Sequence, residues 1–173
     1  MTDASAIDTL LKQLQKETPN CGGEYHFSKV LLDYRGDIKE SIKAYMRQFS
    51  PYQHPFYTDE ATGHKTYLKE LDPENLVLEN IENLTVYVDE KLQYWSTHRT
   101  GLDCREQVTP HYEAAASAFK AALFHFLSQE PFRSAYVISG VDTWSCFGGD
   151  HFNDDTLIQT ANGFYILHFG WSS

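Results

Sequence analysis

The sequence predicts a single α+β domain in which N-terminal and central helices pack on a small, mostly antiparallel C-terminal sheet. Two observations support this fold class. Apolar residues recur with helical spacing in segments before residue 130, and after it they follow patterns typical of strands. The 173 residues suit one domain, and no Pro/Gly/Ser-rich linker or internal repeat divides the sequence. We therefore expect one domain over residues 1–173.

Three segments show the helical pattern most clearly: 5–17, 38–49 and 110–128. The first has apolar residues at i, i+3, i+4 and i+7 from Ile7. The second follows Asp37, with Glu40 three residues later, which is the spacing of a capping box. The third begins at Pro110, a residue suited to the first turn of a helix, with Thr109 as its expected N-cap.

The middle of the chain is more ambiguous. The apolar spacing of residues 25–34 favours a helix, and the prolines and aromatics of 50–58 indicate a loop. We expect a strand over 65–70 and a helix over 85–97. A hairpin between 76–78 and 84–88 remains an alternative to the helix over 85–97.

The C-terminal third predicts three strands, at 134–141, 155–160 and 164–171. Ala161-Asn162-Gly163 separates the last two, and Asn-Gly between strand-like runs is a strong hairpin signal. The last strand is apolar on both faces, so we expect both to be covered. The sequence leaves open whether this strand is a sheet edge that pairs with another chain.

Bulk charge excludes one class of partner. The formal net charge is −10, whereas binding to a phosphate backbone needs basic patches, so no nucleic acid is expected. No apolar run reaches the length of a membrane span, and the first residues lack the pattern of a secretory signal. We therefore expect no membrane association and a cytoplasmic protein.

The acidity is concentrated in two blocks. Residues 59–90 hold nine acidic and two basic side chains, and residues 134–173 hold four Asp without Lys or Arg. An acidic field speeds association with a basic protein, although an acidic run can equally be a solvated face that keeps the chain soluble.

Residues 142–155 are the segment most typical of a binding loop. They are longer than an antiparallel connection needs, and they combine aromatic side chains with carboxylates. Arg can stack on aromatic rings and pair with carboxylates, so the segment suits a basic partner. The alternative is a loop whose aromatics extend the core. The expected partner-binding residues are Asp142, Trp144, Phe147, Asp150, His151, Asp154 and Asp155, together with Glu79 and Glu82 of the first acidic block.

Three His-x-Ser/Thr motifs suggest an alternative function. Two such motifs on neighbouring strands could cradle a phosphodiester, with one His as base and the other as acid. The pairs are His26 with Ser28, His64 with Thr66, and His98 with Thr100. A metal-independent phosphoesterase would need two of these imidazoles in one cleft, and surface histidines are the simpler interpretation.

No cofactor or metal is expected. The motifs for nucleotides, zinc and a serine nucleophile do not occur, although Asp150, His151, Asp154 and Asp155 could in principle supply metal ligands. The three widely spaced cysteines indicate neither a disulfide framework nor a zinc ribbon. His168 lies in an apolar run and is expected to be a hydrogen-bonded core residue.

Three functions remain as hypotheses. The first is a small acidic cytosolic binding protein without enzymatic activity, of the inhibitor or immunity type, that binds a basic protein. The second is the phosphoesterase. The third is a small-ligand module with a pocket lined by Trp144, Phe147 and Tyr136. The sequence leaves the partner and the oligomeric state undetermined.

Overall fold

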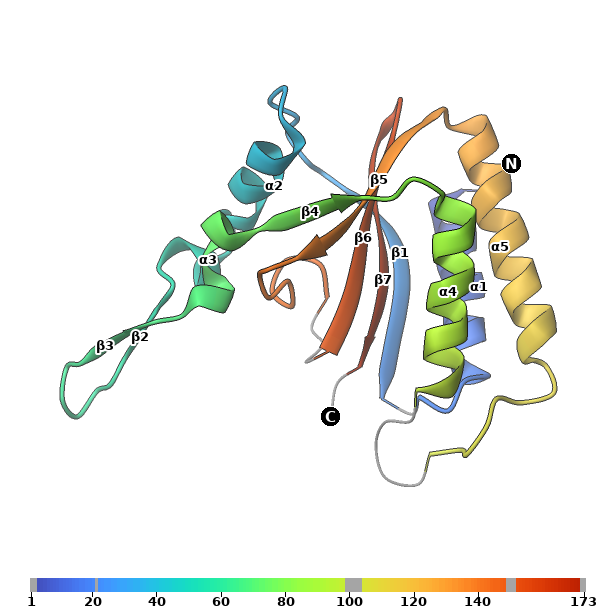
Figure 1. Cartoon of the computed structure of the whole chain (residues 1–173), viewed down its shortest axis with the longest axis horizontal. Coiled ribbons are helices and arrows are strands. Elements are labelled where there is room, and N and C mark those ends of the chain that lie inside the picture. The colour runs from blue at the N-terminus through green and yellow to red at the C-terminus, as the bar shows by residue number, and fades with distance from the viewer. Residues whose placement is uncertain (1–2, 21, 99–103, 149–151, 172–173) are drawn as a thin grey trace.

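Five antiparallel strands form the central sheet, in the order β1-β7-β6-β5-β4 (Figure 1). The structure, a computed structural model, describes residues 3–20, 22–98, 104–148 and 152–171, with the side chain of residue 152 excepted. The strands are β1 (Gly23–Val30), β4 (Val77–Asn80), β5 (Phe132–Ser139), β6 (Phe152–Thr160) and β7 (Gly163–Trp171). A separate two-stranded hairpin consists of β2 (Phe56–Thr58) and β3 (Lys65–Tyr67).

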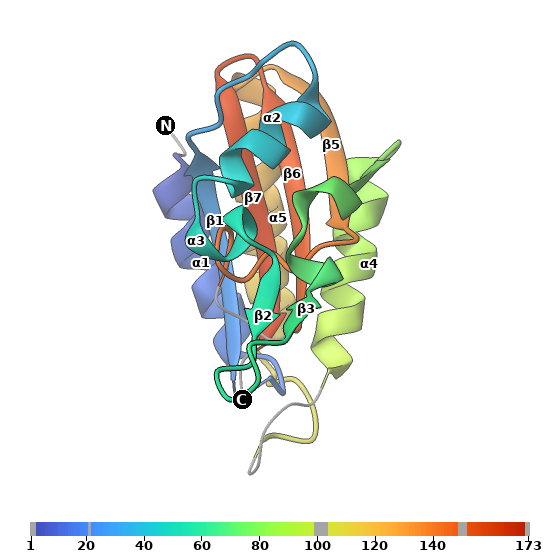
Figure 2. The ribbon, with the colours of Figure 1, turned by 90° about the vertical axis from the view of Figure 1, so that its left-hand side faces the viewer.

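The helices cover both faces of this sheet. α1 (Ala4–Lys16), α4 (Leu84–Thr97) and α5 (Tyr112–Gln129) lie on one face. α2 (Ile38–Met46) and α3 (Ser50–Gln53) lie on the other, together with the β2–β3 hairpin (Figures 1 and 2). The predicted α+β class with helices packed on an antiparallel sheet is therefore confirmed. The sheet also recruits β1 and β4 from outside the C-terminal third.

The three clearest helix predictions are confirmed as α1, α2 and α5. Asp37 caps α2 as its spacing predicts, because its side chain accepts a hydrogen bond from the Glu40 N–H. The start of α5 differs from the prediction. Its N-cap residue is His111, and the Thr109 hydroxyl accepts from the His111 N–H before the helix begins.

The predicted helix over 25–34 is wrong, because this segment contains strand β1. β1 pairs with β7 along its whole length, from Gly23 with Trp171 to Val30 with Phe164. Tyr25 and Phe27 are buried on the same face, as alternate residues of a strand must be. This long-range pairing outweighs a local apolar spacing that suits a helix.

The middle of the chain departs from the prediction in smaller ways. Residues 50–58, expected as a loop, contain α3 and β2, and the strand expected at 65–70 is the shorter β3. The helix favoured over 85–97 is confirmed as α4, where the Asn83 side chain accepts from the Val86 N–H. β4 precedes α4. Of the alternative hairpin, residues 76–78 therefore overlap a strand, whereas residues 84–88 are helical.

The last strand is at the centre of the sheet. β7 pairs with β1 on one side and with β6 on the other, and the chain reverses at Ala161-Asn162 between Thr160 and Gly163. Residues 164–170 are all buried, which confirms that both faces of this strand are covered. The edges of the sheet are β1 and β4, so β7 is unavailable for pairing with another chain.

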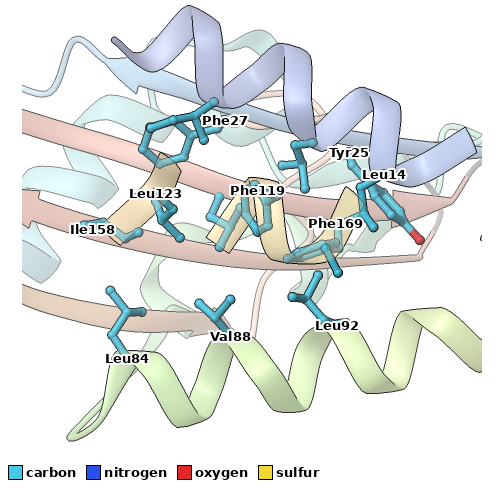
Figure 3. Close-up of a cluster of buried hydrophobic side chains, with 14 of the residues drawn as sticks. Leu14, Tyr25, Phe27, Leu84, Val88, Leu92, Phe119, Leu123, Ile158 and Phe169 are labelled. Atoms are coloured by element: carbon cyan, nitrogen blue, oxygen red, sulfur yellow. The ribbon is translucent and has the colours of Figure 1, made fainter. Parts of the chain in front are cut away.

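One core fills the space between the sheet and the three-helix face. Leu84, Val88 and Leu92 of α4 point toward α5 and the sheet, where Phe119 and Phe169 are buried (Figure 3). α1 adds Ile7, Leu11 and Leu14, which are the positions of the stripe read from the sequence. Burying each such side chain stabilises the fold by roughly 1.5–3 kcal/mol.

A second core lies on the opposite face. Ile42 and Met46 of α2 and Tyr52 of α3 pack against Ile166 and Leu157 of the sheet. The β2–β3 hairpin, which we call the arm, extends beyond this layer (Figures 1 and 2). All six of its paired residues are exposed, so the arm contributes little to either core.

The cysteines correct a sequence expectation. Cys104 is disulfide-bonded and Cys146 is a free thiol, while Cys21 lies outside the described residues. The bonded Cys104 removes one argument for a reducing compartment, since disulfides persist mainly in oxidising ones. Among the described residues, no helix has both the length and the apolar character needed to cross a membrane.

Position 140 should tolerate only glycine. Gly140 has a φ of 80°, and an added Cβ would lie 2.2 Å from the Asn75 carbonyl oxygen. We expect Gly140→Ala to lower the free energy of unfolding by about 2–4 kcal/mol in urea denaturation, through backbone strain and this clash. Gly36→Ala is the matched control, because Gly36 has a φ of 84° but open space around it. It should cost about 1 kcal/mol. Equal losses in the two variants would show that the clash contributes nothing.

Candidate functional site

The connection between β5 and β6 is anchored to the sheet by a buried carboxylate. Asp155 is 2% exposed, and one of its oxygens accepts a hydrogen bond from the Thr143 hydroxyl. The other oxygen lies 2.7 Å from Nδ1 of His168, which is fully buried. Asn153 donates to the Thr143 hydroxyl oxygen over 3.1 Å. Polar side chains from β6, β7 and the loop thus form one network within the second core.

A second histidine stacks on this network. The rings of His26 and His168, at paired positions of β1 and β7, have centroids 4.4 Å apart and an interplanar angle of 19°. Burial, and then the neighbouring His168, lower the pKa of His26 to about 4. Gly148 lies against the ring of His168, because a Cβ added at Gly148 would be 2.5 Å from Cε1 of that ring.

This arrangement holds the loop in place. A catalytic imidazole must reach a substrate atom, whereas the His168 side chain is 0% exposed. Burial also raises the pKa of the Cys146 thiol to about 12, so it stays protonated at neutral pH and is a poor nucleophile. The expectation that His168 is a hydrogen-bonded core residue is confirmed.

The expected partner-binding residues of the loop occupy different environments. Trp144 is 45% exposed, whereas Phe147 is buried and stacks on Tyr45 with ring centroids 5.6 Å apart. Asp155 is buried as described above, so neither Phe147 nor Asp155 belongs to an exposed surface. Asp150 and His151 lie outside the described residues.

Asp154 and Asp155, expected in the loop, lie instead on strand β6, which begins at Phe152. The Asp154 side chain is on the side of the sheet that α4 covers. It accepts hydrogen bonds from Lys91 Nζ and Trp95 Nε1 of α4, at 2.9 and 3.0 Å. Adjacent Asp154 and Asp155 therefore point to opposite faces of the sheet, as the alternation of an extended strand predicts. A single partner at the surface of the loop could not contact both.

The His-x-Ser/Thr motifs do not converge. His64 and Thr66 belong to the exposed arm, and His98 follows α4 on the three-helix side, against the Trp95 ring. His26 faces the opposite side of the sheet from α4, while Ser28 is exposed. Thr100 lies outside the described residues. The two imidazoles that do meet are His26 and His168, and His168 is outside every motif, so this geometry does not support the phosphoesterase hypothesis.

The small-ligand hypothesis also lacks a geometric basis. Trp144 is exposed to solvent, whereas Phe147 is packed among core residues. The two rings therefore do not line one enclosed cavity.

The structure brings the two acidic segments together. The Asp142 N–H donates to the Glu70 carbonyl over 2.7 Å, and the Tyr52 hydroxyl donates to the Asp142 carbonyl over 2.7 Å. These contacts join the loop that carries the exposed Trp144 to residues 69–71, which follow the arm. We call the exposed residues of this region the arm surface: Phe56, Tyr57, Tyr67, Glu70 and Trp144.

The arm surface combines apolar area with unpaired charge. Phe56, Tyr57 and Tyr67 are 53%, 59% and 47% exposed, with Phe56 and Tyr67 paired on one face of the hairpin and Tyr57 on the other face. Within the described chain Glu70 forms no ion pair, whereas Glu74 nearby is neutralised by Lys43 and Arg47. Sequence reasoning missed the aromatic residues of the arm. The feature that could have revealed them is the presence of three large aromatic residues in two strands that are too short to bury them.

Glu79 and Glu82, the other expected partner residues, are exposed. They form no ion pair with any residue that the structure describes. Glu79 lies on edge strand β4, and Glu82 lies in the turn that leads into α4. Both are accessible.

Comparison with known proteins does not point to a function. No family model matches the chain, and no curated protein or solved structure matches it either. The function must therefore be argued from the geometry alone.

The buried carboxylate should contribute more stability than its neighbour on the other face. We expect Asp155→Ala to lower the free energy of unfolding by about 3–5 kcal/mol, because it leaves Thr143 and His168 without their buried partner. Asp154→Ala is the matched control, since this residue is about one-fifth exposed. It should cost about 1–2 kcal/mol. Urea denaturation at pH 7 measures both, and a larger loss for Asp154 would contradict the assignment.

His26 should make stability depend on pH. Because its pKa is lowered from 6.5 to about 4 in the fold, the unfolded chain binds more protons between these values. The stabilisation from this group is complete above pH 6.5 and is lost as the pH falls toward 4, by up to about 3 kcal/mol. His26→Phe keeps a ring but removes the titration. Denaturation from pH 7 to 4 should therefore show a shallower decline for this variant, and an unchanged slope would contradict the prediction.

Proposed function

We propose that this chain is a non-enzymatic binding protein of the inhibitor or immunity type that uses the arm surface to bind a basic protein. The observation that carries the proposal is the exposure of the large aromatic side chains of the arm, Phe56, Tyr57 and Tyr67. The contact between Asp142 and Glu70 ties the loop that carries the exposed Trp144 to the segment that follows the arm.

Exposed aromatic area supports a binding role. A binding partner that covers exposed aromatic side chains removes their apolar area from water, which favours binding. Tyr and Trp dominate the energetics of protein interfaces. Phe56 and Tyr67 already contact each other, with ring centroids 5.6 Å apart. The arm therefore presents a partly ordered aromatic surface, which reduces the entropy lost on binding.

Charge supports the basic character of the partner. Glu60 and Glu70 are exposed and form no ion pair with any described residue. The net charge of −10 adds a long-range attraction for cations. Arg fits such a surface better than Lys does, because its planar group can stack on Tyr57 or Trp144 while it pairs with a carboxylate.

Selection from a library tests this proposal. Random peptides of about twelve residues would be selected on the immobilised chain, and an enriched peptide would then be measured by calorimetry. We expect enrichment of Arg and Lys, and a loss of affinity of about tenfold or more in the double variant Tyr57→Ser, Trp144→Ser. Raising NaCl from about 50 to about 300 mM should also weaken binding, because salt screens exposed charges.

Tyr94→Ser is the control, because Tyr94 is 43% exposed on α4, away from the arm. It should leave the affinity of the enriched peptide unchanged. Enrichment of acidic or uncharged peptides would overturn the proposal. So would full affinity in the variant that lacks Tyr57 and Trp144.

A further inference from the structure

A groove lies between the start of α4 and the end of α5, on the three-helix side of the sheet. It is open to solvent and has a volume of about 370 Å³. Its apolar lining comes from Leu84, Phe124, Leu127 and Phe132, and its polar rim includes Glu82 and Asn83. This volume is near the lower end of the roughly 300–1,000 Å³ typical of ligand pockets, so it suits one large side chain rather than a large cofactor.

Part of the apolar lining is open to solvent. Phe132 is the first residue of β5, and β4 pairs only with residues 136–139 of that strand. Phe132, which lines the groove, is 42% exposed. Contiguous apolar area of this kind, with a polar rim, is typical of a docking site.

The charged side chain among the described residues that line the groove is a carboxylate. Glu82 at its rim is exposed and forms no ion pair within the described chain. Glu79 lies on the same side of the sheet. It pairs with Val137, which in turn pairs with Thr156, and Thr156 hydrogen-bonds to Tyr87 of α4.

The end of α5 adds to this negative potential. The helix has 18 residues and no basic residue in its last turn. The partial negative charge of its carbonyl end is thus uncompensated by the helix itself, and a cation is favoured there.

We propose that this α4–α5 groove binds a peptide segment of a partner protein in which a large apolar side chain is adjacent to Arg or Lys. The apolar side chain would fill the groove over Phe132 and Leu127, and the cation would pair with Glu82 at the rim. A second copy of this chain fits less well, because it would bring the same carboxylates to the contact.

This surface is separate from the arm surface. The arm extends from the α2–α3 side of the sheet, whereas α4 and α5 cover the other side (Figure 1). The groove can therefore bind its ligand whether or not the arm binds a partner.

Nuclear magnetic resonance titration with two small probes tests the proposal. The probes are N-acetyl-Leu-Arg-amide and its charge-reversed counterpart N-acetyl-Leu-Glu-amide, each raised to millimolar concentration. We expect saturable shifts of the amides of residues 82–86 and 124–132 with the Arg probe. The affinity of the Glu probe should be lower by about fivefold or more, because its carboxylate would meet the like charge of Glu82.

Variants separate the two parts of the recognition. Phe132→Ser should weaken the Arg probe about fivefold or more by removing apolar contact, and Glu82→Gln should reduce the preference for Arg over Glu. Val77→Ser is the matched control, since Val77 is 45% exposed on β4 but does not line the groove. The amide spectrum of each variant verifies that it is folded.

The outcomes decide the proposal independently of the arm. Equal binding of both probes, unchanged binding in the Phe132 variant, or shifts spread over the whole chain would each overturn it. The double variant at Tyr57 and Trp144 should bind the Arg probe as the unmodified chain does. A loss there would assign the binding to the arm and overturn the groove.

Discussion

The pairing of Asp155 with His168 organises one side of this molecule. A carboxylate buried in a core is costly unless its hydrogen-bonding capacity is satisfied. Here His168 satisfies one oxygen and Thr143 the other, so the loop that carries Thr143 must fold back on the sheet. The position of the Trp144 backbone follows from this, because its N–H donates to the Asp142 carboxylate two residues earlier.

The same strand supplies a different polar contact to the opposite face. Asp154 binds Lys91 and Trp95, which fixes α4 against the sheet. Two consecutive aspartates thus connect β6 to the loop on one side and to a helix on the other. Neither contact leaves the carboxylate of Asp154 or Asp155 available to a partner. Glu60 and Glu70, the exposed carboxylates in and next to the arm, belong instead to residues 59–90.

Local patterns in the sequence predicted most helices, because the apolar stripe of α1 and the Asp37 cap of α2 are local features of the sequence. β1 was missed because the partner that makes it a strand is β7, far away in sequence. For the site, the sequence correctly pointed to residues 142–155 as unusual. It could not separate the exposed Trp144 from the buried Phe147 and Asp155, since that division depends on which side chains meet His168 and Tyr45. The aromatic residues of the arm were missed because exposure is not a local property.

The position of β1 has a consequence for how the chain folds. Gly23–Val30 can form ladder hydrogen bonds only with β7, which ends at Trp171. β1 must therefore wait for β7 before it can pair within the sheet. Until then Tyr25 and Phe27 remain uncovered by the sheet, and contacts so distant in sequence form slowly. A chain shortened before β7 would lose the centre of the sheet rather than an edge, and it would expose these aromatics to aggregation.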